Sequence, residues 1–347
     1  MPNIVLNHYQ HIAVGVICRK NYILISKRAK NVDQGNLWEF PGGKVEANET
    51  AFQALFRELN EELGIRIEQA EPLITIPFSY PVKSNQKTTN NVLLDVWIVS
   101  NFSGRPYGKE NQPIKWVDKK QLNNYSFPEA NQSIIHALAL PDTYVITADE
   151  NISIEKNKQV FIKRFKNLCL QGQSLIQLRF KTHLPGKDVL QEINLIAANY
   201  QLNLQFNSAS IRSLLSDCLS ARDDILKYSH FGIHLISADL YNNRLCELRK
   251  LFSGYFSASC HNEADILKAN ALRLDFIVIS PVNKTTSHPQ AKPIGWHQFE
   301  QLTKLAQMPT YALGGMKTDD IIQAKQIGAQ GIAAISEFWD TTDEKEK

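Results

Sequence analysis

The feature that most constrains the fold of this chain is a regular alternation of short apolar runs and helical segments between residues 143 and 340. The segments between the runs, such as DVLQEINLIAANYQ and DDIIQAKQIG, place apolar residues at helical spacing and begin with residue types that cap helices. Eight β/α units are the number that a closed parallel barrel requires, so the sequence predicts an α/β domain of the (β/α)8 TIM barrel type. A doubly wound open sheet is the structural alternative. The eight runs are YVITA from 144, LIQLRF from 175, LNLQF from 202, FGIHLI from 231, YFSASC from 255, FIVISP from 276, TYALGG from 310 and GIAAIS from 331.

The first part of the chain follows a different pattern. Short β-rich runs (HIAVGVIC, YILISKR, VLLDVWIV and IKWVD) accompany one strongly amphipathic helix at 50–63 and a second helix near 129–139. This mixture is typical of an α+β domain, and the pattern changes at Leu140, Pro141 and Asp142. A chain of 347 residues is long enough for two domains with a core each. We therefore predict one domain over 1–139 and a second over 143–340.

Composition and charge exclude several classes of protein. With 43% hydrophobic and 21% charged residues and a formal charge of +3, the chain reads as a globular protein without a direct nucleic-acid or membrane partner. No apolar stretch approaches the roughly 20 residues that span a bilayer. Because the cysteines are scattered and never form a C-x-x-C pair, neither a disulfide framework nor a zinc cluster is expected, and we predict a cytoplasmic protein. The five cysteines are Cys18, Cys169, Cys218, Cys246 and Cys260.

Residues 42–65, GGKVEANETAFQALFRELNEELGI, place an acidic helix after a Gly-Gly turn. On a helix, Glu58, Glu61 and Glu62 lie at i, i+3 and i+4, so their carboxylates project from one face. Carboxylates are hard ligands suited to Mg²⁺, whereas the alternative interpretation is a solvated acidic face. We expect the acidic face to look outward while the opposite stripe packs on the core. That stripe consists of Phe52, Leu55, Phe56, Leu59 and Leu63.

The spacing of this stretch is that of the Nudix box, G-x5-E-x7-R-E-U-x-E-E-x-G-U, in which U is aliphatic. Residues 1–139 therefore resemble the Nudix hydrolases, whose α+β fold holds a mixed sheet between helices. Nine fixed positions make this a specific match. The matching residues are Gly43, Glu49, Arg57, Glu58, Leu59, Glu61, Glu62, Gly64 and Ile65.

The Nudix resemblance assigns roles to these residues. It implies that Glu58, Glu61 and Glu62, with the carbonyl of Gly42, bind Mg²⁺, and Mn²⁺ is a second candidate cation. It further implies that Arg57 orients a carboxylate through a bidentate pair. Glu49 should support the loop, and Gly42 and Gly43 should let the backbone approach the metal closely.

Further words over residues 1–139 resemble the MutT branch of the family, the 8-oxo-dGTP diphosphatases of the nucleotide pool: AVGVI, LISKRA, LWEFPGGK, GRPYGKENQPIKWV and FPEANQSII. The resemblance implies that Glu110 joins the metal site, that Arg28 contacts the nucleotide and that Asn131 reads the oxidised purine. An amide can pair with a purine edge in two places, although a helix N-cap is the alternative role of Asn131. Phe127 would form an apolar wall beside the base. Trp38 is expected in the core.

The implied reaction is hydrolysis of a small-molecule nucleoside triphosphate, 8-oxo-dGTP, to the monophosphate and diphosphate. Catalysis of such a reaction is mostly positioning and charge neutralisation, with water attacking the β-phosphorus. Glu61 and Glu110 are both candidates to accept the proton of the water.

Residues 143–340 resemble thiamine phosphate synthase and its TenI-like relatives in the words YVITADE, LIQLRFK, FGIHLISADL, SASCH, FIVISPVNKTTSHP, TYALGGMKTDDI and GAQGIAAIS. The resemblance implies a pyrophosphate grip, a backbone phosphate cup and an Mg²⁺ ligand at the carboxyl ends of the strands, with a thiamine-precursor phosphate as ligand. The grip would use Gln177, Arg179 and Lys181, the cup Gly314, Gly315 and Ser336, and the metal Asp239, beside Asn207.

The barrel half departs from the family pattern in three places. The N-D word, whose aspartate is the other metal ligand, is Asn207 and Ser208 here, and serine cannot supply the lost charge. Phe180 replaces a glutamate, and a lysine is lost around Ser287. Binding of Mg²⁺ and pyrophosphate should therefore both weaken. Three histidines are expected to form capping or loop hydrogen bonds and not to catalyse: His234, His261 and His288.

The chain resembles a bacterial fusion of these two types, and this pairing leaves two alternatives open. The Nudix half could hydrolyse damaged thiamine diphosphate while the barrel senses or makes thiamine phosphate. Alternatively, the barrel could be a noncatalytic module that binds a phosphate ligand or supports the Nudix half. Arg28 and Asn131 favour a purine nucleotide, because a thiamine substrate would favour an aromatic sandwich.

Overall fold

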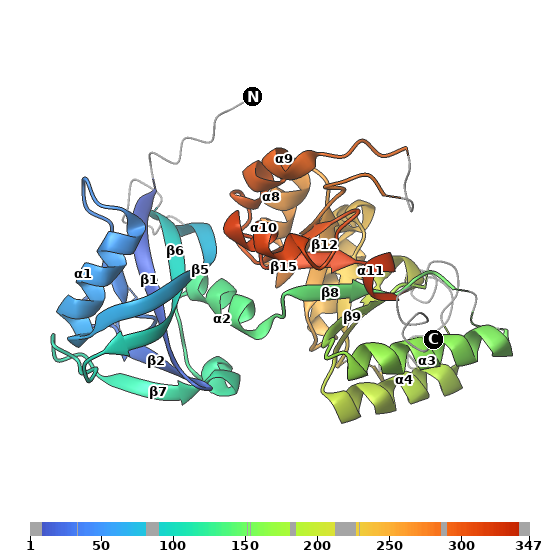
Figure 1. The fold of residues 1–347 in the computed structure, drawn as a ribbon, viewed down its shortest axis with the longest axis horizontal. Coiled ribbons are helices and arrows are strands. Elements are labelled where there is room, and N and C mark those ends of the chain that lie inside the picture. Colours follow the sequence, from blue (N-terminus) through green and yellow to red (C-terminus); the bar gives the residue numbers. More distant parts are fainter. Residues whose placement is uncertain are drawn as a thin grey trace. The chain divides into compact units, whose positions relative to one another are not determined.

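The structure is a computed structural model that describes residues 9–32, 34–80, 90–150, 152, 154–180, 185–211, 227–228, 230–285 and 290–339. The chain divides into two compact units, Met1–Ala139 and Leu140–Lys347 (Figure 1). Within the described residues, no helix has an apolar stretch long enough to cross a bilayer.

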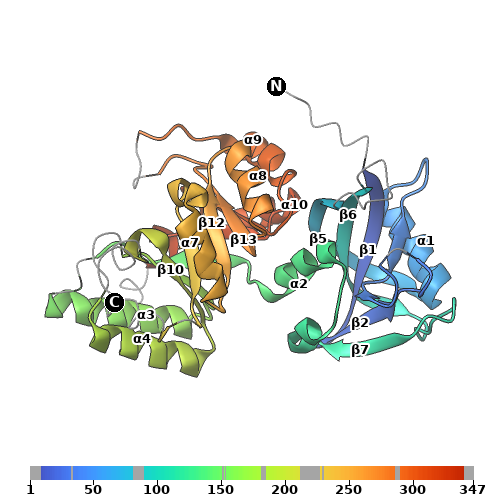
Figure 2. The ribbon, with the colours of Figure 1, turned by 180° about the vertical axis from the view of Figure 1, so that it is seen from behind.

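The N-terminal unit is built on a mixed sheet with the strand order β3-β2-β1-β6-β5, in which β4 also pairs with β1 and β7 with β2. β1 runs parallel to β6 and antiparallel to β2 and β4. Helices α1 and α2 cover opposite faces of this sheet, as the two views in Figures 1 and 2 show. The predicted α+β fold with a mixed sheet between helices is confirmed. The elements are β1 Gln10–Arg19, β2 Tyr22–Lys27, β3 Trp38–Glu39, β4 Gly42–Lys44, α1 Ala51–Leu63, β5 Arg66–Tyr80, β6 Asn90–Ser103, β7 Ile114–Asp118, η2 Lys119–Asn124, η3 Glu129–Asn131 and α2 Gln132–Ala139.

Helix α1 is fixed at both ends by local sequence. Thr50 forms a capping box with Gln53, in which each side chain accepts from the other residue's backbone N–H. Gly64 ends the helix in the left-handed region at φ 66°, where glycine has no steric penalty. Gly15 of β1 lets the helix pack closely, because a Cβ there would lie 2.9 Å from Leu59 Cδ1. The buried residues are Ala54, Leu55, Leu59 and Leu63.

The prediction that Phe52 faces the core is wrong. Its side chain is 40% exposed and lies against Trp97, with the ring centroids 5.2 Å apart. Phe52 sits in the first turn of α1, where Ala54 and Leu55 already fill the contact with the sheet. The acidic face is also less open than expected, since Glu58 and Glu62 are both half-buried.

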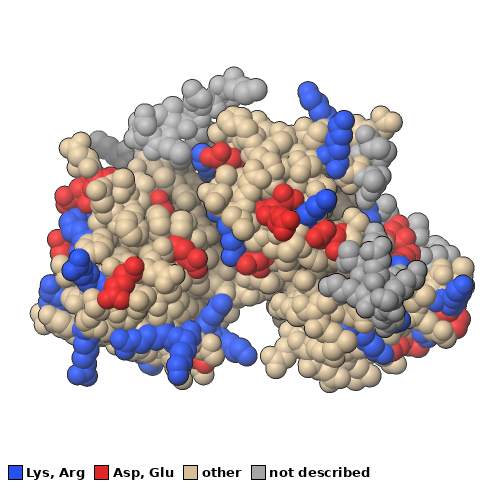
Figure 3. All heavy atoms as spheres, viewed as in Figure 1, with Lys and Arg blue, Asp and Glu red and all other residues tan. Residues whose placement is uncertain are grey.

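Charged side chains of both signs are scattered over the face drawn in Figure 3, in keeping with the small net charge. Lysine and arginine side chains gather along the lower edge of the N-terminal unit in that view. Strand β7 and the following η2 helix carry the exposed Lys115, Lys119 and Lys120. Lysines on an edge strand discourage pairing with other chains.

The C-terminal unit is a closed barrel of parallel strands in the order β10-β11-β12-β13-β14-β15-β8-β9. β15 pairs with β8 and thereby closes the sheet, which excludes the doubly wound alternative and confirms the (β/α)8 prediction. All eight predicted runs form barrel strands. They are β8 Thr143–Ile146, β9 Leu175–Leu178, β10 Asn203–Asn207, β11 Gly232–Leu235, β12 Phe256–Cys260, β13 Phe276–Ile279, β14 Thr310–Leu313 and β15 Gly331–Ala334.

The helices around the barrel bury apolar residues against the strands, and α4 begins before the residue that was predicted to cap it. Helix α4 follows Gly186 and α10 follows Asp319, and neither residue makes a side-chain capping hydrogen bond. The capping residue predicted for α4, Asp188, lies in the first turn and pairs with Lys158 of α3. The described helices are α3 Glu155–Leu170, α4 Lys187–Tyr200, η4 Ser237–Tyr241, α7 Asn243–Cys246, η5 Glu247–Lys250, α8 Glu263–Ala271, α9 Gly295–Thr303, α10 Asp320–Gln326 and α11 Ser336–Trp339.

Candidate functional site

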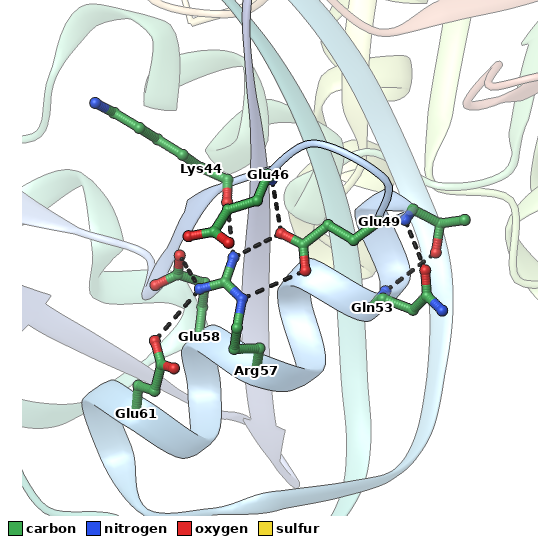
Figure 4. A network of polar contacts seen from close by, with 8 residues as sticks. Lys44, Glu46, Glu49, Gln53, Arg57, Glu58 and Glu61 are labelled. Atoms are coloured by element: carbon green, nitrogen blue, oxygen red, sulfur yellow. Dashed lines mark hydrogen bonds and ion pairs between the residues drawn. The ribbon is translucent and has the colours of Figure 1, made fainter.

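Arg57, on the polar face of α1, is the centre of a network of carboxylates (Figure 4). Its Nε and Nη2 donate to the two oxygens of Glu49 at 3.3 and 2.6 Å, which is a bidentate pair. Its Nη1 donates to Glu58 at 2.8 Å and to Glu61 at 3.3 Å, and Nη2 also donates to the Lys44 carbonyl at 3.0 Å. Arg57 therefore joins the helix to the loop before it and fixes two of its glutamates.

The Gly-Gly turn lets Glu58 and Glu62 reach the backbone of β4. A Cβ on Gly43 would lie 2.1 Å from Glu58 Cδ, so only glycine leaves space for this carboxylate. The Gly42 N–H donates to Glu62 at 3.3 Å. Gly42 itself adopts φ 150° and approaches the backbone of Ala13, where a Cβ would be 2.1 Å from the carbonyl oxygen.

Glu62 is the carboxyl group of this region whose pKa is raised most. Burial, with the charges of Glu39, Glu58 and Glu110, raises the pKa of Glu62 to about 8, although the Gly42 N–H lowers it. Burial of the carboxyl group is the largest cause of this shift, and the nearby carboxylates add to it. Three carboxylates from three different segments, Glu39, Glu58 and Glu110, therefore act on the charge of Glu62.

The loop after β6 brings Glu110 to this cluster. The Lys109 N–H and the Gln112 amide both donate to the Glu62 carbonyl at the end of α1, at 2.9 and 3.1 Å. The Glu110 N–H in turn donates to Gln112 Oε1 at 2.9 Å. These bonds attach the loop to α1, and Glu110 remains exposed beside Glu62.

The residues predicted to hold the nucleotide lie on three further segments. Arg28 forms an ion pair with Glu39 of β3. Burial raises the pKa of Glu39, and the charge of Arg28 offsets only part of this shift. Phe127 is buried and stacks on Phe40, with the ring centroids 5.3 Å apart. Asn131 is 9% exposed and ends η3, where its N–H donates to the Pro128 carbonyl. Trp38 is partly buried against the core, as expected.

In the C-terminal unit, a cavity of about 870 Å³ is lined by residues at the carboxyl ends of the barrel strands. This is the end at which barrel enzymes place their sites. Of the predicted residues, Gln177, Arg179, Asn207 and Gly314 line this cavity, together with His234 and His261. Lys181, Ser287 and His288 lie outside the described residues.

Hydrogen bonds between buried polar side chains connect two of the residues that line this cavity, Gln177 and His234. Gln177 donates to Tyr144 Oη at 2.8 Å, and Tyr144 donates to Gln205 at 2.5 Å. Ser257 links Gln205 to His234 Nδ1, and Ser259 lies 2.8 Å from His234 Nε2. Burial lowers the pKa of His234 to about 3, so this histidine is neutral.

His261, the second described histidine of the cavity, donates from Nδ1 to the Ser280 carbonyl at 2.7 Å. His261 thus forms a loop hydrogen bond, whereas His234 lies on β11 and bonds to two serines of the neighbouring strand β12, which is neither a cap nor a loop contact.

Asp239 of η4 and Ser208, which directly follows β10, are joined by a hydrogen bond. Ser208 Oγ donates to Asp239 Oδ2 at 2.5 Å and accepts from the Ile236 N–H at 3.0 Å. Asp239 is 2% exposed and Ser208 is fully buried. Neither residue lines the 870 Å³ cavity.

A smaller cavity of about 200 Å³ lies at the ends of β14 and β15 and shares Gly314 with the larger one. It is lined by Gly314, Gly315 and Ser336, the three residues predicted to form the phosphate cup, and by Lys284 and Lys317. Gly314 and Gly315 have φ values of 109° and 64°, a region that favours glycine.

Comparison with known proteins matches each unit to a family. The description "NUDIX domain" matches residues 13–137, and "Thiamine monophosphate synthase" matches residues 143–338. An 8-oxo-dGTP diphosphatase of Escherichia coli (strain K12) is 38% identical over 128 residues, covering 37% of this chain and 94% of that protein. The chain belongs to the Nudix family in its N-terminal part and to the thiamine monophosphate synthase family in its C-terminal part.

Two further relatives show how far each likeness extends. A CTP pyrophosphohydrolase of Escherichia coli (strain K12) is 32% identical to the Nudix domain over 127 residues, covering 36% of this chain and 88% of that protein. A thiamine-phosphate synthase of Prochlorococcus marinus (strain AS9601) is 34% identical over 207 residues, covering 59% of this chain. The match spans 53% of that synthase, about half of its length.

Nudix hydrolases generally require a divalent cation, and the donor set of this Nudix domain fits one. Glu62 is surrounded by like charges, and its neighbours offer hard oxygen ligands. The described carboxylates do not close around a single point, because no three of the described His, Cys, Asp and Glu side chains form a group that could hold a metal ion. Arg57 draws Glu58 and Glu61 to one side, whereas Glu62 turns to Gly42. Mg²⁺ suits such an open site because it keeps waters and takes ligands from substrate phosphate.

The synthase-like barrel does not fit the Mg²⁺ ion that its family implies. The family resemblance gives two positions for metal-binding carboxylates. One of them is Ser208 in this chain, and the other is Asp239, which accepts a hydrogen bond from the Ser208 hydroxyl. No described residue that lines the larger cavity is an aspartate or a glutamate. The replacement of the family's aspartate by Ser208 therefore leaves a hydrogen bond to Asp239 where the family pattern implies a second carboxylate.

Sequence reasoning missed two charged residues near these sites. Glu39 belongs to the word LWEFPGGK and lies on a strand that leads to Gly42, which is the signal that could have identified it. Lys292 lines the barrel cavity from the segment between β13 and α9, and no spacing rule places a residue of such a segment.

Proposed function

We propose that the Nudix domain is a Mg²⁺-dependent pyrophosphohydrolase that converts 8-oxo-dGTP and water to 8-oxo-dGMP and diphosphate, and so serves nucleotide-pool sanitation. The observation that carries the proposal is the arrangement of the glutamates of α1, in which Arg57 holds Glu58 and Glu61 while the Gly42 N–H holds Glu62. The 38% identity to an 8-oxo-dGTP diphosphatase over 94% of its length supports this substrate. Mn²⁺ is a possible substitute for Mg²⁺.

The proposed cation ligands are Gly42, through its carbonyl, and Glu58, Glu61, Glu62 and Glu110. When bound, the cation would neutralise phosphate charge and lower the pKa of a coordinated water. Arg57 orients Glu58 and Glu61 through the hydrogen bonds that its Nη1 donates to both carboxylates. Both Glu61 and Glu110 are exposed carboxylates beside the cluster, and each could accept the proton of the attacking water.

The proposed nucleotide contacts come from Arg28, Asn131 and Phe127. Phe127 offers an apolar surface, already stacked on Phe40, on which a base could pack. The Asn131 amide would donate to and accept from the purine edge. Glu39 would hold Arg28 in place through their ion pair.

The experiment that tests this proposal compares 8-oxo-dGTP, dGTP, CTP and thiamine diphosphate as substrates of the wild type and Asn131→Ala. We expect the wild type to prefer 8-oxo-dGTP, and Asn131→Ala to reduce this preference about tenfold or more, because a bidentate pair discriminates by about 1–3 kcal/mol. The exposed Asn123→Ala is the control. Unchanged discrimination in Asn131→Ala would exclude this role. A preference of the wild type for CTP or thiamine diphosphate would identify another substrate.

For the barrel, we propose a site that binds a thiamine-precursor phosphate and lies near Asp239. The residues proposed to form this site are Gln177, Arg179, Lys181, Asn207, Gly314, Gly315 and Ser336. The cavity lined by four of these residues supports it. We expect no thiamine phosphate from the pyrimidine diphosphate and the thiazole phosphate, because Ser208 replaces a metal-binding carboxylate. Product formation at a rate comparable to a synthase would contradict that expectation. We further propose that residues 140–142 link two domains, 1–139 and 143–340.

A further inference from the structure

We propose that Gln112 is a positioning residue of the Nudix site, which links the backbone of Glu110 to the backbone of Glu62 and so sets where the Glu110 carboxylate lies. Gln112 is itself not a proposed cation ligand, and the sequence assigned it no role. The inference rests on the proposed function, because Glu110 and Glu62 are cation ligands only in that proposal.

The loop that carries Glu110 connects β6 to β7 and packs against the end of α1. The last four carbonyl groups of an α-helix have no complete set of partners within the helix, so donors from elsewhere must satisfy them. Lys109, the residue before Glu110, supplies two such donors. Its N–H donates to the Glu62 carbonyl at 2.9 Å, and its Nζ donates to the Asn60 carbonyl at 3.0 Å. The position of the loop is therefore tied to the last turn of α1.

The Gln112 side chain makes a second connection between the loop and the helix. Its Nε2 donates to the Glu62 carbonyl at 3.1 Å, and its Oε1 accepts from the Glu110 N–H at 2.9 Å. A carbonyl oxygen has two lone pairs, so Glu62 can accept from Lys109 and Gln112 at once. One side-chain amide thus stands between the backbones of Glu110 and Glu62. This place requires a side chain that donates at one end and accepts at the other.

The loop is folded so that this amide fits. The Asn111 N–H donates to the Gly108 carbonyl at 3.1 Å and closes a tight turn over residues 108–111, with Glu110 as its third residue. Asn111 has φ 63°, a region that asparagine enters more readily than most residues. A Cβ on Gly108 would lie 1.9 Å from the Gln112 carbonyl oxygen and 2.9 Å from its Oε1. Glycine at this position therefore leaves the space that Gln112 needs.

Glu110 depends on such a connection more than the glutamates of α1 do. Those glutamates are held through their carboxylates, by Arg57 and by the Gly42 N–H, whereas Glu110 is held through its backbone N–H. The Glu110 side chain is exposed, yet its charge contributes to the raised pKa of Glu62, so the two carboxyl groups lie near each other. Loss of the Gln112 amide should therefore weaken cation binding by releasing Glu110.

The test is a double-mutant cycle in the full chain with Gln112→Met and Glu110→Gln. Its two readouts are the dissociation constant of Mn²⁺, from the electron paramagnetic resonance of the free ion, and kcat/KM for 8-oxo-dGTP. Methionine has a similar length but no amide, so we expect Gln112→Met to weaken Mn²⁺ binding and to lower kcat/KM about tenfold or more. In the Glu110→Gln background the same change should cost less than about twofold, because the carboxylate that Gln112 positions is gone. The exposed Gln121→Met on η2 is the control and should leave both readouts unchanged.

The cycle separates positioning from a purely structural role. A Gln112→Met loss of equal size in both backgrounds would show that Gln112 only stabilises the fold, and would overturn the inference. Unchanged Mn²⁺ binding and kcat/KM in Gln112→Met, or in Glu110→Gln, would overturn it as well. If thermal unfolding in EDTA shows that Gln112→Met does not fold, Gln112→Asn takes its place in the cycle, because its shorter amide cannot reach both backbones.

Failure of the proposed function gives a different result from failure of this inference. If the wild type prefers another of the tested substrates to 8-oxo-dGTP, the proposed substrate is wrong, and the cycle is measured with the preferred substrate and with Mn²⁺. If the wild type hydrolyses 8-oxo-dGTP but the two changes act independently, the function stands and the role of Gln112 is excluded. A wild type that binds no Mn²⁺ and hydrolyses none of the substrates would exclude both.

Discussion

At the scale of single residues, Arg57 is the side chain on which the geometry of the acidic site depends most. One guanidinium donates to three carboxylates and to a backbone carbonyl, and its two-pronged contact with Glu49 needs the planar fork of arginine. These bonds raise the pKa of Arg57 far above its ordinary value. The positions of Glu58 and Glu61 are thus set by a neighbour that is itself not a proposed metal ligand.

Replacement of Arg57 by lysine tests this role. Lysine keeps the charge but loses the bidentate contact, so we expect kcat/KM to fall about 10–100-fold, the range seen when residues that orient metal ligands are changed. The concentration of Mg²⁺ needed for half-maximal activity should rise as well. Arg66→Lys, at an exposed position just beyond α1, is the control. A variant with unchanged kinetics and Mg²⁺ dependence would show that Arg57 has no such role.

The raised pKa of Glu62 predicts how the stability of the metal-free protein depends on pH. This pKa of about 8 in the metal-free fold, against an ordinary 4.5, means that the folded state binds more protons than the unfolded state between these values. The stability of the metal-free protein should therefore fall as pH rises from about 4.5 towards 8, and Glu62→Gln should flatten this slope. Thermal unfolding in EDTA over this pH range measures it.

The same group should couple Mg²⁺ binding to proton release, since the cation needs the ionised carboxylate. Calorimetric titration with Mg²⁺ at pH 7 in buffers of different ionisation enthalpy should show release of about one proton, and less at pH 9. Binding without proton release at pH 7 would contradict the assigned electrostatics.

At the scale of elements, helix α1 connects local sequence to the site, because it carries three of the proposed metal ligands on a face fixed by its own caps. The capping box of Thr50 and Gln53 and the left-handed Gly64 set where the helix begins and ends. Its packing against Gly15 then sets the depth at which the carboxylates meet β4.

The cap itself can be tested. Thr50→Ala should destabilise the N-terminal unit by about 1 kcal/mol, since it removes the acceptor for the Gln53 N–H, whereas Thr50→Ser should keep most of the stability. Chemical unfolding followed by tryptophan fluorescence, to which Trp97 beside α1 contributes, measures the difference. Equal stability of the alanine and serine variants would exclude a contribution of the cap.

Elements with a strong repeating pattern could be predicted from the sequence, and contacts between distant segments could not. All eight barrel strands and helix α1 followed from periodicity, because the spacing of apolar residues reports burial directly. Phe52 was misplaced because periodicity does not show where a helix leaves its sheet. Asp188, predicted to cap α4, lies in its first turn instead and pairs with Lys158 of α3, a contact that local sequence does not encode.

In the candidate site, too, the sequence predicted which residues share an element but not which distant groups they contact. The motif placed Glu58, Glu61 and Glu62 on one helix, but only the fold shows that Glu62 turns to Gly42 while Glu58 and Glu61 turn to Arg57. The roles assigned to these residues stay predictions until they are measured.

At the scale of the whole molecule, the chain combines two families whose phosphate sites differ in the charge of their walls. The Nudix domain gathers carboxylates, as a site for a cation and a polyphosphate needs. The described wall of the barrel cavity gathers cations and neutral groups. In our proposal, one protein thus offers a cation-dependent site in the Nudix domain and a second site for a phosphate compound in the barrel.

The barrel site should regain a dependence on Mg²⁺ when its lost carboxylate is restored. In Ser208→Asp, two carboxylates would face each other at the place where Ser208 now contacts Asp239, and we expect Mg²⁺ to stabilise this variant and to increase its binding of pyrophosphate. Ser208→Asn, which has the same shape without the charge, is the matched control and should show neither effect. A Ser208→Asp variant that folds but does not respond to Mg²⁺ would contradict this interpretation of the position.

The central claim is that the carboxylate cluster of α1 serves Mg²⁺-dependent hydrolysis of 8-oxo-dGTP. Its most direct test is kcat/KM for 8-oxo-dGTP in Mg²⁺, measured for the wild type, for Glu58→Gln and for Glu46→Gln, an exposed glutamate of the same loop region. The account predicts that the wild type releases 8-oxo-dGMP and diphosphate, that Glu58→Gln loses about 100-fold or more, and that Glu46→Gln stays close to the wild type. Full activity of Glu58→Gln, or no hydrolysis of 8-oxo-dGTP by the wild type, would contradict it.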